Sequence, residues 1–182
     1  FFQWIGGNKK VIDLGCRNCN LTSYFIKDND VYGIDIDAAS LALCPSEIKT
    51  SQFDLNGSWE EGRENMFDVV VSSEVVEHLY HPDKVFKKVN VILKPGGYFM
   101  GSVPNAFNLK NRIRLFFAKT KNTPMGEPTH INHFSYESLK SLLEDNFAEV
   151  EIVPLVQKKW QWLADIFPGL ASFLLVFRAK KQ

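Results

Sequence analysis

The sequence lacks the features that mark several broad classes of protein. Its longest mainly apolar stretch, residues 171–177, is far shorter than the about 20 residues that a membrane-spanning helix needs, so no transmembrane segment is expected. Neither sign of charge is in excess, because 21 lysine and arginine residues balance 21 aspartate and glutamate residues. A protein that grips nucleic acid by its phosphates usually carries a basic excess, so no nucleic-acid partner is expected.

Cysteine is also scarce, at three residues in a chain of 182. A chain of this length can bury an adequate core without disulfides, and an odd cysteine count favours the reducing cytosol over a secreted framework. Cys16 and Cys19 form a C-x-x-C pair, but a structural zinc site normally combines two such compact pairs. The sequence therefore predicts a cytoplasmic protein with no need for disulfides and no bound metal.

The residues that are present fit one α/β domain, with 45% hydrophobic and 23% charged residues and ordinary numbers of glycine and proline. Strand and helix patterns alternate, and the unbroken valine run 69–71 is typical of a strand buried on both faces of a parallel sheet. This order predicts a doubly wound, Rossmann-like α/β fold with right-handed crossovers. Strands are expected at residues 10–14, 31–34, 49–53, 67–72, 98–103, 147–156 and 172–178, and helices after Asn20, over 37–43, after Pro82 and after Ser135.

Residues 104–133 interrupt this alternation and are longer than a usual connection, so a single domain over 1–182 with a functional insertion or lid is expected. Residues 108–118 in this segment have apolar positions at helical spacing and basic positions between them. Packing of an amphipathic helix on the sheet is the favoured interpretation, and a basic rim for an acidic substrate or a weak membrane-surface contact are alternatives. Three aromatic residues near the end of the chain are expected to pack under the last two strands: Trp160, Trp162 and Phe167.

The first strand-to-helix turn carries the main functional signal, because ligands of open α/β sheets bind beyond the carboxyl ends of the strands. Gly15 allows a tight bend there, and Asp35 ends the second strand 20 residues later. A carboxylate at that position can accept both hydroxyls of a ribose, whereas its alternative role is to cap the next helix. Arg17 stands where a dinucleotide fingerprint needs its second glycine, so an adenosine ligand without a pyrophosphate is predicted.

Several segments together resemble the class I S-adenosylmethionine-dependent methyltransferases. The resemblance covers residues 11–178, in the order and spacing of that family, and it implies seven strands with the last antiparallel. The segments that resemble the family's first, second, fourth and fifth motifs and a late segment are residues 11–16, 31–37, 67–79, 93–98 and 133–144.

The resemblance implies that the cofactor is S-adenosylmethionine, with S-adenosylhomocysteine as the product. The first turn would hold the methionine portion, and the end of the second strand would hold the ribose and adenine. Residues after the third strand would accept from the adenine amino group, and those after the fourth would border the methyl group. The positions so implied are Asp13, Gly15, Cys16, Arg17, Asp35, Ile36, Asp54, Leu55, Ser72, Ser73 and Glu74.

Four histidines supply candidates for proton transfer, because histidine is the usual base that deprotonates a hydroxyl or amine nucleophile. His78 follows the fourth strand, and His133 borders the insertion, so both are candidate catalytic residues. His130 and Asn105 are candidate substrate-binding residues. For the histidines, a purely structural role is the alternative interpretation.

The sequence thus predicts a methyltransferase that acts on a small-molecule or glycan-type acceptor. One departure from the family supports a different function: Arg17 and Cys19 stand where the family's first motif usually has glycines. Residues 102–105 and 111–115 also resemble the methionine-biosynthesis protein W group, for which a partner role has been proposed. The alternative is therefore a methyltransferase-fold regulatory or partner protein with a weakened cofactor site.

Overall fold

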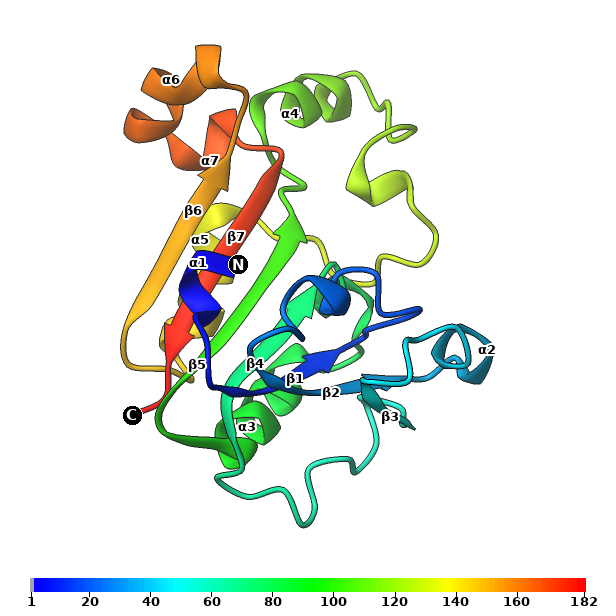
Figure 1. Ribbon diagram of the computed structural model, residues 1–182. Coiled ribbons are helices and arrows are strands. Elements are labelled where there is room, and N and C mark those ends of the chain that lie inside the picture. Colours follow the sequence, from blue (N-terminus) through cyan, green and yellow to red (C-terminus); the bar gives the residue numbers. More distant parts are fainter. Residues whose placement is uncertain (1) are drawn as a thin grey trace.

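A seven-stranded sheet forms the centre of the computed structural model, which describes residues 2–182 (Figure 1). The strand order is β3-β2-β1-β4-β5-β7-β6. The first five strands pair in parallel, and β7 is antiparallel to both β5 and β6. The predicted doubly wound sheet with an antiparallel last strand is confirmed. The strands are β1 (Lys10–Leu14), β2 (Asp30–Asp35), β3 (Lys49–Gln52), β4 (Phe67–Ser73), β5 (Leu93–Pro104), β6 (Val150–Leu155) and β7 (Leu174–Lys180).

Helices connect most of the strands, and the two longest begin at their predicted positions. Pro82 is the first residue of α3, and Ser135 caps α5 through a capping box with Ser138. The α-helices are α1 (Phe2–Ile5), α2 (Ala38–Leu41), α3 (Pro82–Ile92), α4 (Leu109–Phe116), α5 (Tyr136–Glu144), α6 (Gln161–Ile166) and α7 (Pro168–Ala171). Single 3-10 turns form η1 (Thr22–Tyr24), η2 (Val76–His78), η3 (Pro124–Gly126) and η4 (Lys158–Trp160).

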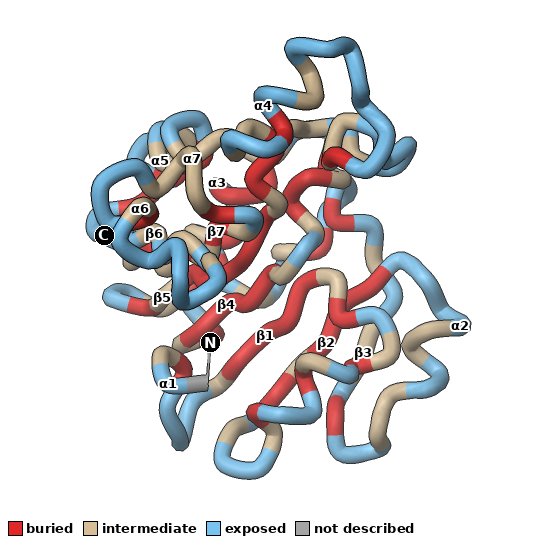
Figure 2. Tube along the Cα trace, turned by 90° about the horizontal axis from the view of Figure 1, so that it is seen from above, coloured by how far each residue is buried: buried red, intermediate tan, exposed pale blue. Residues whose placement is uncertain are grey.

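The core lies on both faces of the sheet, and the central strands β1 and β4 are among the most deeply buried parts of the chain (Figure 2). Val70 packs on one face with Phe86 of α3 and other aromatic side chains. Val69 and Val71 point to the opposite face, where Ile5 of α1 also packs. The two-sided burial expected of the valine run is therefore confirmed, and it places β4 in the middle of the molecule.

Two local expectations were wrong. The helix expected after Asn20 is only the single turn η1, because the Thr22 hydroxyl turns inward and donates to Asp13 at 2.6 Å, while Tyr24 stays 75% exposed. The fifth strand begins at Leu93 rather than Tyr98, with an irregular pairing to β4 that accommodates residues 94–97.

The expected packing of the later aromatic residues on the sheet was also wrong. Helix α4 buries Asn111 alone, while Phe116 is 84% exposed. The three aromatic residues expected under the last strands, Trp160, Trp162 and Phe167, are 47%, 60% and 52% exposed. The reason is positional: α4 and α6 lie beyond one end of the sheet, at the top of Figure 1, where no strand surface remains to cover them. No helix within residues 2–182 is long and apolar enough to cross a membrane.

Candidate active site

Two adjoining cavities lie at the carboxyl ends of β1, β2 and β4. The larger, of about 560 Å³, extends over the ends of β2 and β3 to η2, and we call it the large cavity. The smaller, of about 320 Å³, lies over the turn after β1, and we call it the small cavity. Gly15, Arg17 and Ser73 line both. Together the cavities form one elongated site with two chemically different ends.

All but one of the predicted cofactor positions line this site. The exception is Ser72, which is 2% exposed and lies beneath the cavity walls in β4. The predicted residues that line the large cavity are Gly15, Arg17, Asp35, Ile36, Asp54, Leu55, Ser73 and Glu74, with His78 beside them. Those that line the small cavity are Asp13, Gly15, Cys16, Arg17 and Ser73.

The turn after β1 has a backbone that only glycine adopts easily, although only one glycine is present. Gly15 has φ +78°, and a Cβ atom there would meet Val75 Cγ2 at 2.3 Å. Arg17 and Cys19 have φ +49° and +60°, in the left-handed region where a side chain costs about 1 kcal/mol. These are the two positions where the family usually has glycine. The departure in sequence therefore leaves the shape of the turn intact.

Asp35 is held in a fixed orientation at the end of β2. Its Oδ2 accepts from the Arg17 N–H at 2.8 Å, and its Oδ1 accepts from the Asp37 N–H at 2.9 Å. The cap of α2 is Asp37, whose side chain accepts from the Ala39 N–H, so helix capping is not the role of Asp35. Each Asp35 oxygen keeps a further lone pair for a ligand hydroxyl.

Asp13 supplies the polar end of the small cavity. The side chain is 2% exposed, and burial raises its pKa to about 7, even though the Thr22 hydroxyl donates to it. A buried carboxyl with one hydrogen bond is stabilised as the anion when a cation binds beside it. The small cavity is therefore suited to an ammonium group.

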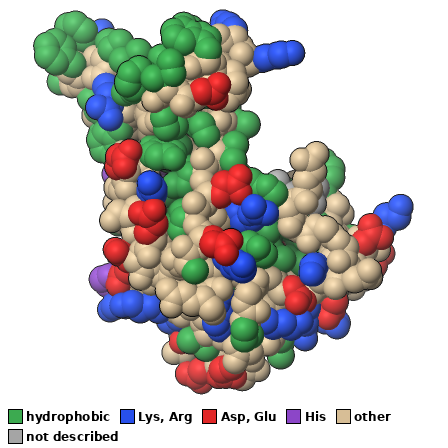
Figure 3. Space-filling model, turned by 90° about the vertical axis from the view of Figure 1, so that its left-hand side faces the viewer, with side chains coloured by type: hydrophobic (Ala, Val, Ile, Leu, Met, Phe, Trp, Pro, Cys, Tyr) green, Lys and Arg blue, Asp and Glu red, His purple; other side chains and the backbone are tan. Residues whose placement is uncertain are grey.

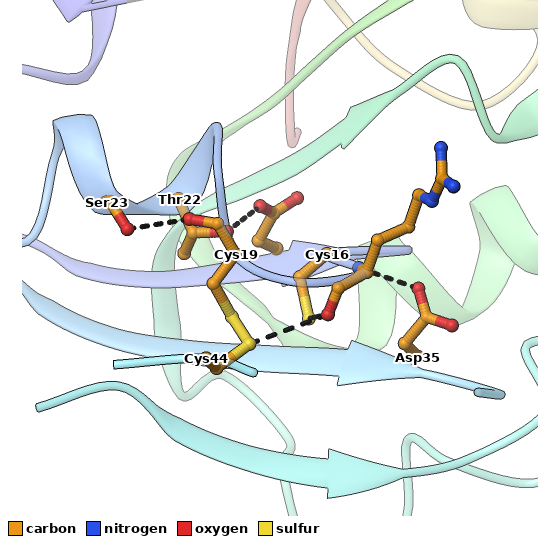
Figure 4. Close-up of a disulfide and its surroundings, with 8 residues drawn as sticks. Cys16, Cys19, Thr22, Ser23, Asp35 and Cys44 are labelled. Carbon is orange, nitrogen blue, oxygen red and sulfur yellow. Dashed lines mark hydrogen bonds between the residues drawn. A yellow bond between two sulfur atoms is a disulfide. The ribbon is translucent and has the colours of Figure 1, made fainter. Parts of the chain in front are cut away.

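A disulfide that the sequence analysis did not expect joins Cys19, in the first turn, to Cys44, which follows α2 (Figure 4). The Cα atoms are 5.1 Å apart because β1 and β2 are neighbouring parallel strands, so the segments after them meet at one edge. Cys16 remains a buried thiol, and burial raises its pKa to about 12. With a disulfide present, the cysteine count no longer supports a reducing compartment, and the cytoplasmic location stays a prediction.

His78 lines the large cavity close to the end of β4, and its tautomer is set by the insertion. The ring Nδ1 lies 2.8 Å from the Thr129 carbonyl oxygen, which can only accept a hydrogen bond. Nδ1 therefore carries the proton in the neutral ring, and Nε2 is left with a lone pair. Thr129 itself lines the large cavity, so the end of the insertion returns to the site.

Glu77 was missed by the sequence analysis, and it is the most unusual polar group near the site. Its side chain is 1% exposed, neither carboxylate oxygen has a partner within residues 2–182, and burial raises its pKa to about 8. Ligand atoms of Glu77, His78 and His130 lie within 4.8 Å of one another. Such a carboxylate and two imidazoles could hold a divalent cation. The only signal in the sequence was the Glu77-His78 pair, because His130 is brought near by the fold.

The other predicted residues have different surroundings. Asn105 is fully buried, and its amide donates to the Gly169 and Ser172 carbonyl groups, which ties the end of β5 to α7. It lines neither cavity, so the geometry gives its predicted substrate contact no support. His133 Nε2 is buried without a partner within the described residues, and its catalytic role stays a prediction.

Comparisons with known proteins agree with this geometry. A family model described as "Methyltransferase domain" matches residues 1–150. The mitochondrial ubiquinone biosynthesis O-methyltransferases of Mus musculus and Homo sapiens are 30% and 34% identical over 95% of this chain. The matches cover 51% and 52% of those proteins, so the chain spans about half the length of these curated relatives.

Solved structures show the same fold. A SAM dependent methyltransferase from Archaeoglobus fulgidus has a TM-score of 0.74 at 19% identity, and the match covers 98% of this chain and 89% of that one. An S-adenosylmethionine dependent methyltransferase from Mesorhizobium loti has a TM-score of 0.70 at 19% identity, covering 96% and 92%. The resemblance to the methionine-biosynthesis protein W group finds no support among these relatives and structures.

Proposed function

This chain belongs to the class I S-adenosylmethionine-dependent methyltransferases, and from that premise we propose that the protein methylates an oxygen atom of a small-molecule acceptor. The observation that carries the proposal is the pair of adjoining cavities, which meet at Gly15, Arg17 and Ser73 and end beside His78. The O-methyltransferase names of the relatives support oxygen as the acceptor atom. A glycan acceptor has no comparable support.

Two carboxylates support binding of the cofactor's ammonium group and its ribose hydroxyls. Asp13 offers a buried carboxylate to the ammonium group, and Asp35 offers two oriented oxygens to the ribose hydroxyls. Ile36 is 62% exposed on the wall of the large cavity, where an adenine ring can cover it. S-adenosylmethionine supplies a methyl group already activated by its sulfonium charge, so the protein's task is to align the acceptor and exclude water.

His78 serves as the general base in this proposal. Its Nε2 would take the proton of the acceptor hydroxyl, which frees the acceptor oxygen to bond the methyl group that S-adenosylmethionine would supply, with S-adenosylhomocysteine as the leaving group. The Thr129 carbonyl holds Nδ1–H and stabilises the imidazolium that results. The Nδ1–Thr129 contact is the observation that favours His78 over His133.

Glu77, His78 and His130 support a second route, in which they hold a divalent cation that lowers the pKa of the acceptor hydroxyl. The specific observation behind it is the Glu77 carboxyl, fully buried without a hydrogen-bond partner in the described chain. Only one of the two routes can operate, because the lone pair of His78 Nε2 can either accept the proton or bind the metal.

The insertion forms the roof of the site in this proposal. Glu77 O accepts from the Ile131 and Asn132 N–H groups at 2.9 Å each, and Thr129 lines the large cavity. These contacts fasten the end of the insertion to η2, beside the proposed base. Deletion of residues 121–127 should then spare cofactor binding and abolish methyl transfer.

Calorimetry with S-adenosylhomocysteine is the first test. Binding supports the methyltransferase proposal, whereas a folded protein that does not bind supports the regulatory or partner alternative. The second test follows transfer of labelled methyl groups to a panel of phenols and catechols. His78→Asn should keep cofactor binding and lose about 100-fold or more of the rate. Loss of the wild-type rate in a chelator, restored by Mg²⁺, Mn²⁺ or Zn²⁺, would identify the metal route instead.

A further inference from the structure

One end of the molecule exposes an unusual number of large apolar side chains. They lie in α4, in η4 and α6, and directly after these two helices, and we call residues 108–121 and 157–171 the apolar end. Figure 3 shows hydrophobic side chains gathered at the top of the molecule, the end where α4 and α6 lie in Figure 1. The most exposed are Ile113, Phe116, Phe117, Trp162, Ile166 and Phe167, each between 52% and 84% exposed.

The apolar end is hollowed as well as exposed. A groove of about 520 Å³ separates α4 from the segment that contains α6 and α7. Ile113 lines one side, and Trp160 and Leu163 line the other. Exposed apolar surface of this size is uncommon on a protein that works alone in water, and it marks a surface that something else covers.

The net charge of the apolar end indicates the kind of partner that covers it. Residues 108–121 and 157–171, which form the apolar end, contain seven lysine and arginine residues and a single acidic residue, Asp165. None of the seven forms an ion pair within residues 2–182. Because the whole chain has no net charge, the rest of the molecule carries an excess of six negative charges. The apolar end therefore has a net positive charge, whereas the rest of the chain has a net negative one.

We propose that the apolar end docks on the surface of an anionic lipid bilayer. Phenylalanine and tryptophan side chains enter the boundary between headgroups and acyl chains, while lysine and arginine bind the anionic headgroups. Helix α4 has the pattern of such an element, with Phe116 exposed and Arg112 and Arg114 nearby. A second copy of the chain is a poorer occupant, because a symmetric contact would bring the two sets of unpaired cations together.

The test is co-sedimentation of the full chain with vesicles of phosphatidylcholine alone or mixed with phosphatidylglycerol. We expect binding to the mixed vesicles that weakens as salt is raised. Lys158→Gln with Lys159→Gln should weaken it about thirtyfold, and Phe116→Ser with Phe117→Ser at least tenfold. The matched controls carry equivalent changes elsewhere: Lys9→Gln with Lys27→Gln, and Leu43→Ser, which is 72% exposed near α2. The controls should bind like the wild type.

Several results would overturn the proposal. They are no binding to the mixed vesicles, equal binding to both vesicle types, or controls that fail as badly as the test variants. A dimer that the Phe116→Ser, Phe117→Ser variant abolishes, without vesicle binding, would show that a second copy covers the apolar end. Calorimetry with S-adenosylhomocysteine is expected to be unchanged in every variant, so failure here is distinguishable from failure of the proposed function.

Discussion

The turns around the two cavities and the apolar end lie near the same edge of the sheet but are built in opposite ways. Around the cavities, Asp13, Asp35 and the backbone of Gly15 all have hydrogen-bond partners, and a disulfide joins the segments that follow β1 and β2. In the apolar end, Phe116 and Trp162 face solvent, and the nearby lysine and arginine side chains form no ion pairs within residues 2–182.

The contrast teaches how one small domain divides its tasks. A site for a small ligand works best when its own groups are already in place, because little ordering of the protein remains to oppose binding. A surface that meets a large and variable partner needs exposed apolar area and charge instead. Left-handed backbone at Arg17, Cys19 and Glu74, which surrounding structure must hold, lies in the turns after β1 and β4, although Ala118 in the apolar end has such a backbone too.

The largest expected effect concerns the disulfide. Cys44→Ser should lower the free energy of unfolding by about 3 kcal/mol, because Cys19 and Cys44 are 25 residues apart and the unfolded chain gains the freedom of that loop. Urea denaturation followed by circular dichroism measures the change. Wild-type protein in excess dithiothreitol is the control and should match the variant. Equal free energies of unfolding with and without the reductant would show that the Cys19–Cys44 disulfide does not stabilise the fold.

Asp35 gives the next largest effect. Asp35→Ala should weaken S-adenosylhomocysteine binding by about ten- to a hundredfold, equivalent to about 1.5–3 kcal/mol, because two hydroxyls lose a charged acceptor. The lost bonds to the Arg17 and Asp37 N–H groups should also loosen the turn. Glu47→Ala, at an exposed carboxylate outside the cavities, is the calorimetric control. Unchanged affinity in Asp35→Ala would refute the assignment of the ribose position.

Asp13 should make cofactor binding depend on pH. Its pKa is raised from 3.8 to about 7, so between these values the folded protein holds a proton that the unfolded chain has lost. Its contribution to stability is therefore full below about pH 4 and is lost as pH rises to 7. An ammonium group needs the carboxylate, so S-adenosylhomocysteine affinity should rise about tenfold per pH unit up to about pH 7, or about 1.4 kcal/mol per unit.

Calorimetry at several pH values measures this slope. Asp13→Asn should flatten it, since the amide cannot ionise, and should lower affinity at pH 8. A wild-type affinity that does not change between pH 5 and pH 7 would contradict the assignment of the ammonium site to the small cavity.

The smallest effect has the opposite sign. Arg17→Gly should raise the free energy of unfolding by about 1 kcal/mol, because glycine adopts φ +49° without strain, and should change cofactor affinity little. Ala118→Gly is a matched control in the apolar end, at φ +54°, and should be stabilised similarly. A large gain in affinity for Arg17→Gly alone would show that the arginine obstructs the site and would favour the partner-protein alternative.

Local sequence patterns predicted much of the sheet and of the residues around the two cavities. The bounds of β1 were predicted correctly, and the valine run in β4 is buried on both faces as expected. The spacing from Gly15 to Asp35 predicted two residues that line one cavity. These features depend on short-range periodicity and on single residues that directly follow strands. Both can be recognised in the local sequence without knowledge of the tertiary structure.

The sequence by itself therefore determined the sheet and most of its strands, and with the family resemblance it predicted many of the positions that line the cavities. Only the tertiary structure decided which distant residues meet. It joined Cys19 to Cys44 and placed His130 beside Glu77, because neighbouring strands and the returning insertion bring these segments together. It also left Phe116 and Trp162 exposed, since apolar periodicity marks a helix face but cannot tell whether the sheet extends far enough to cover it.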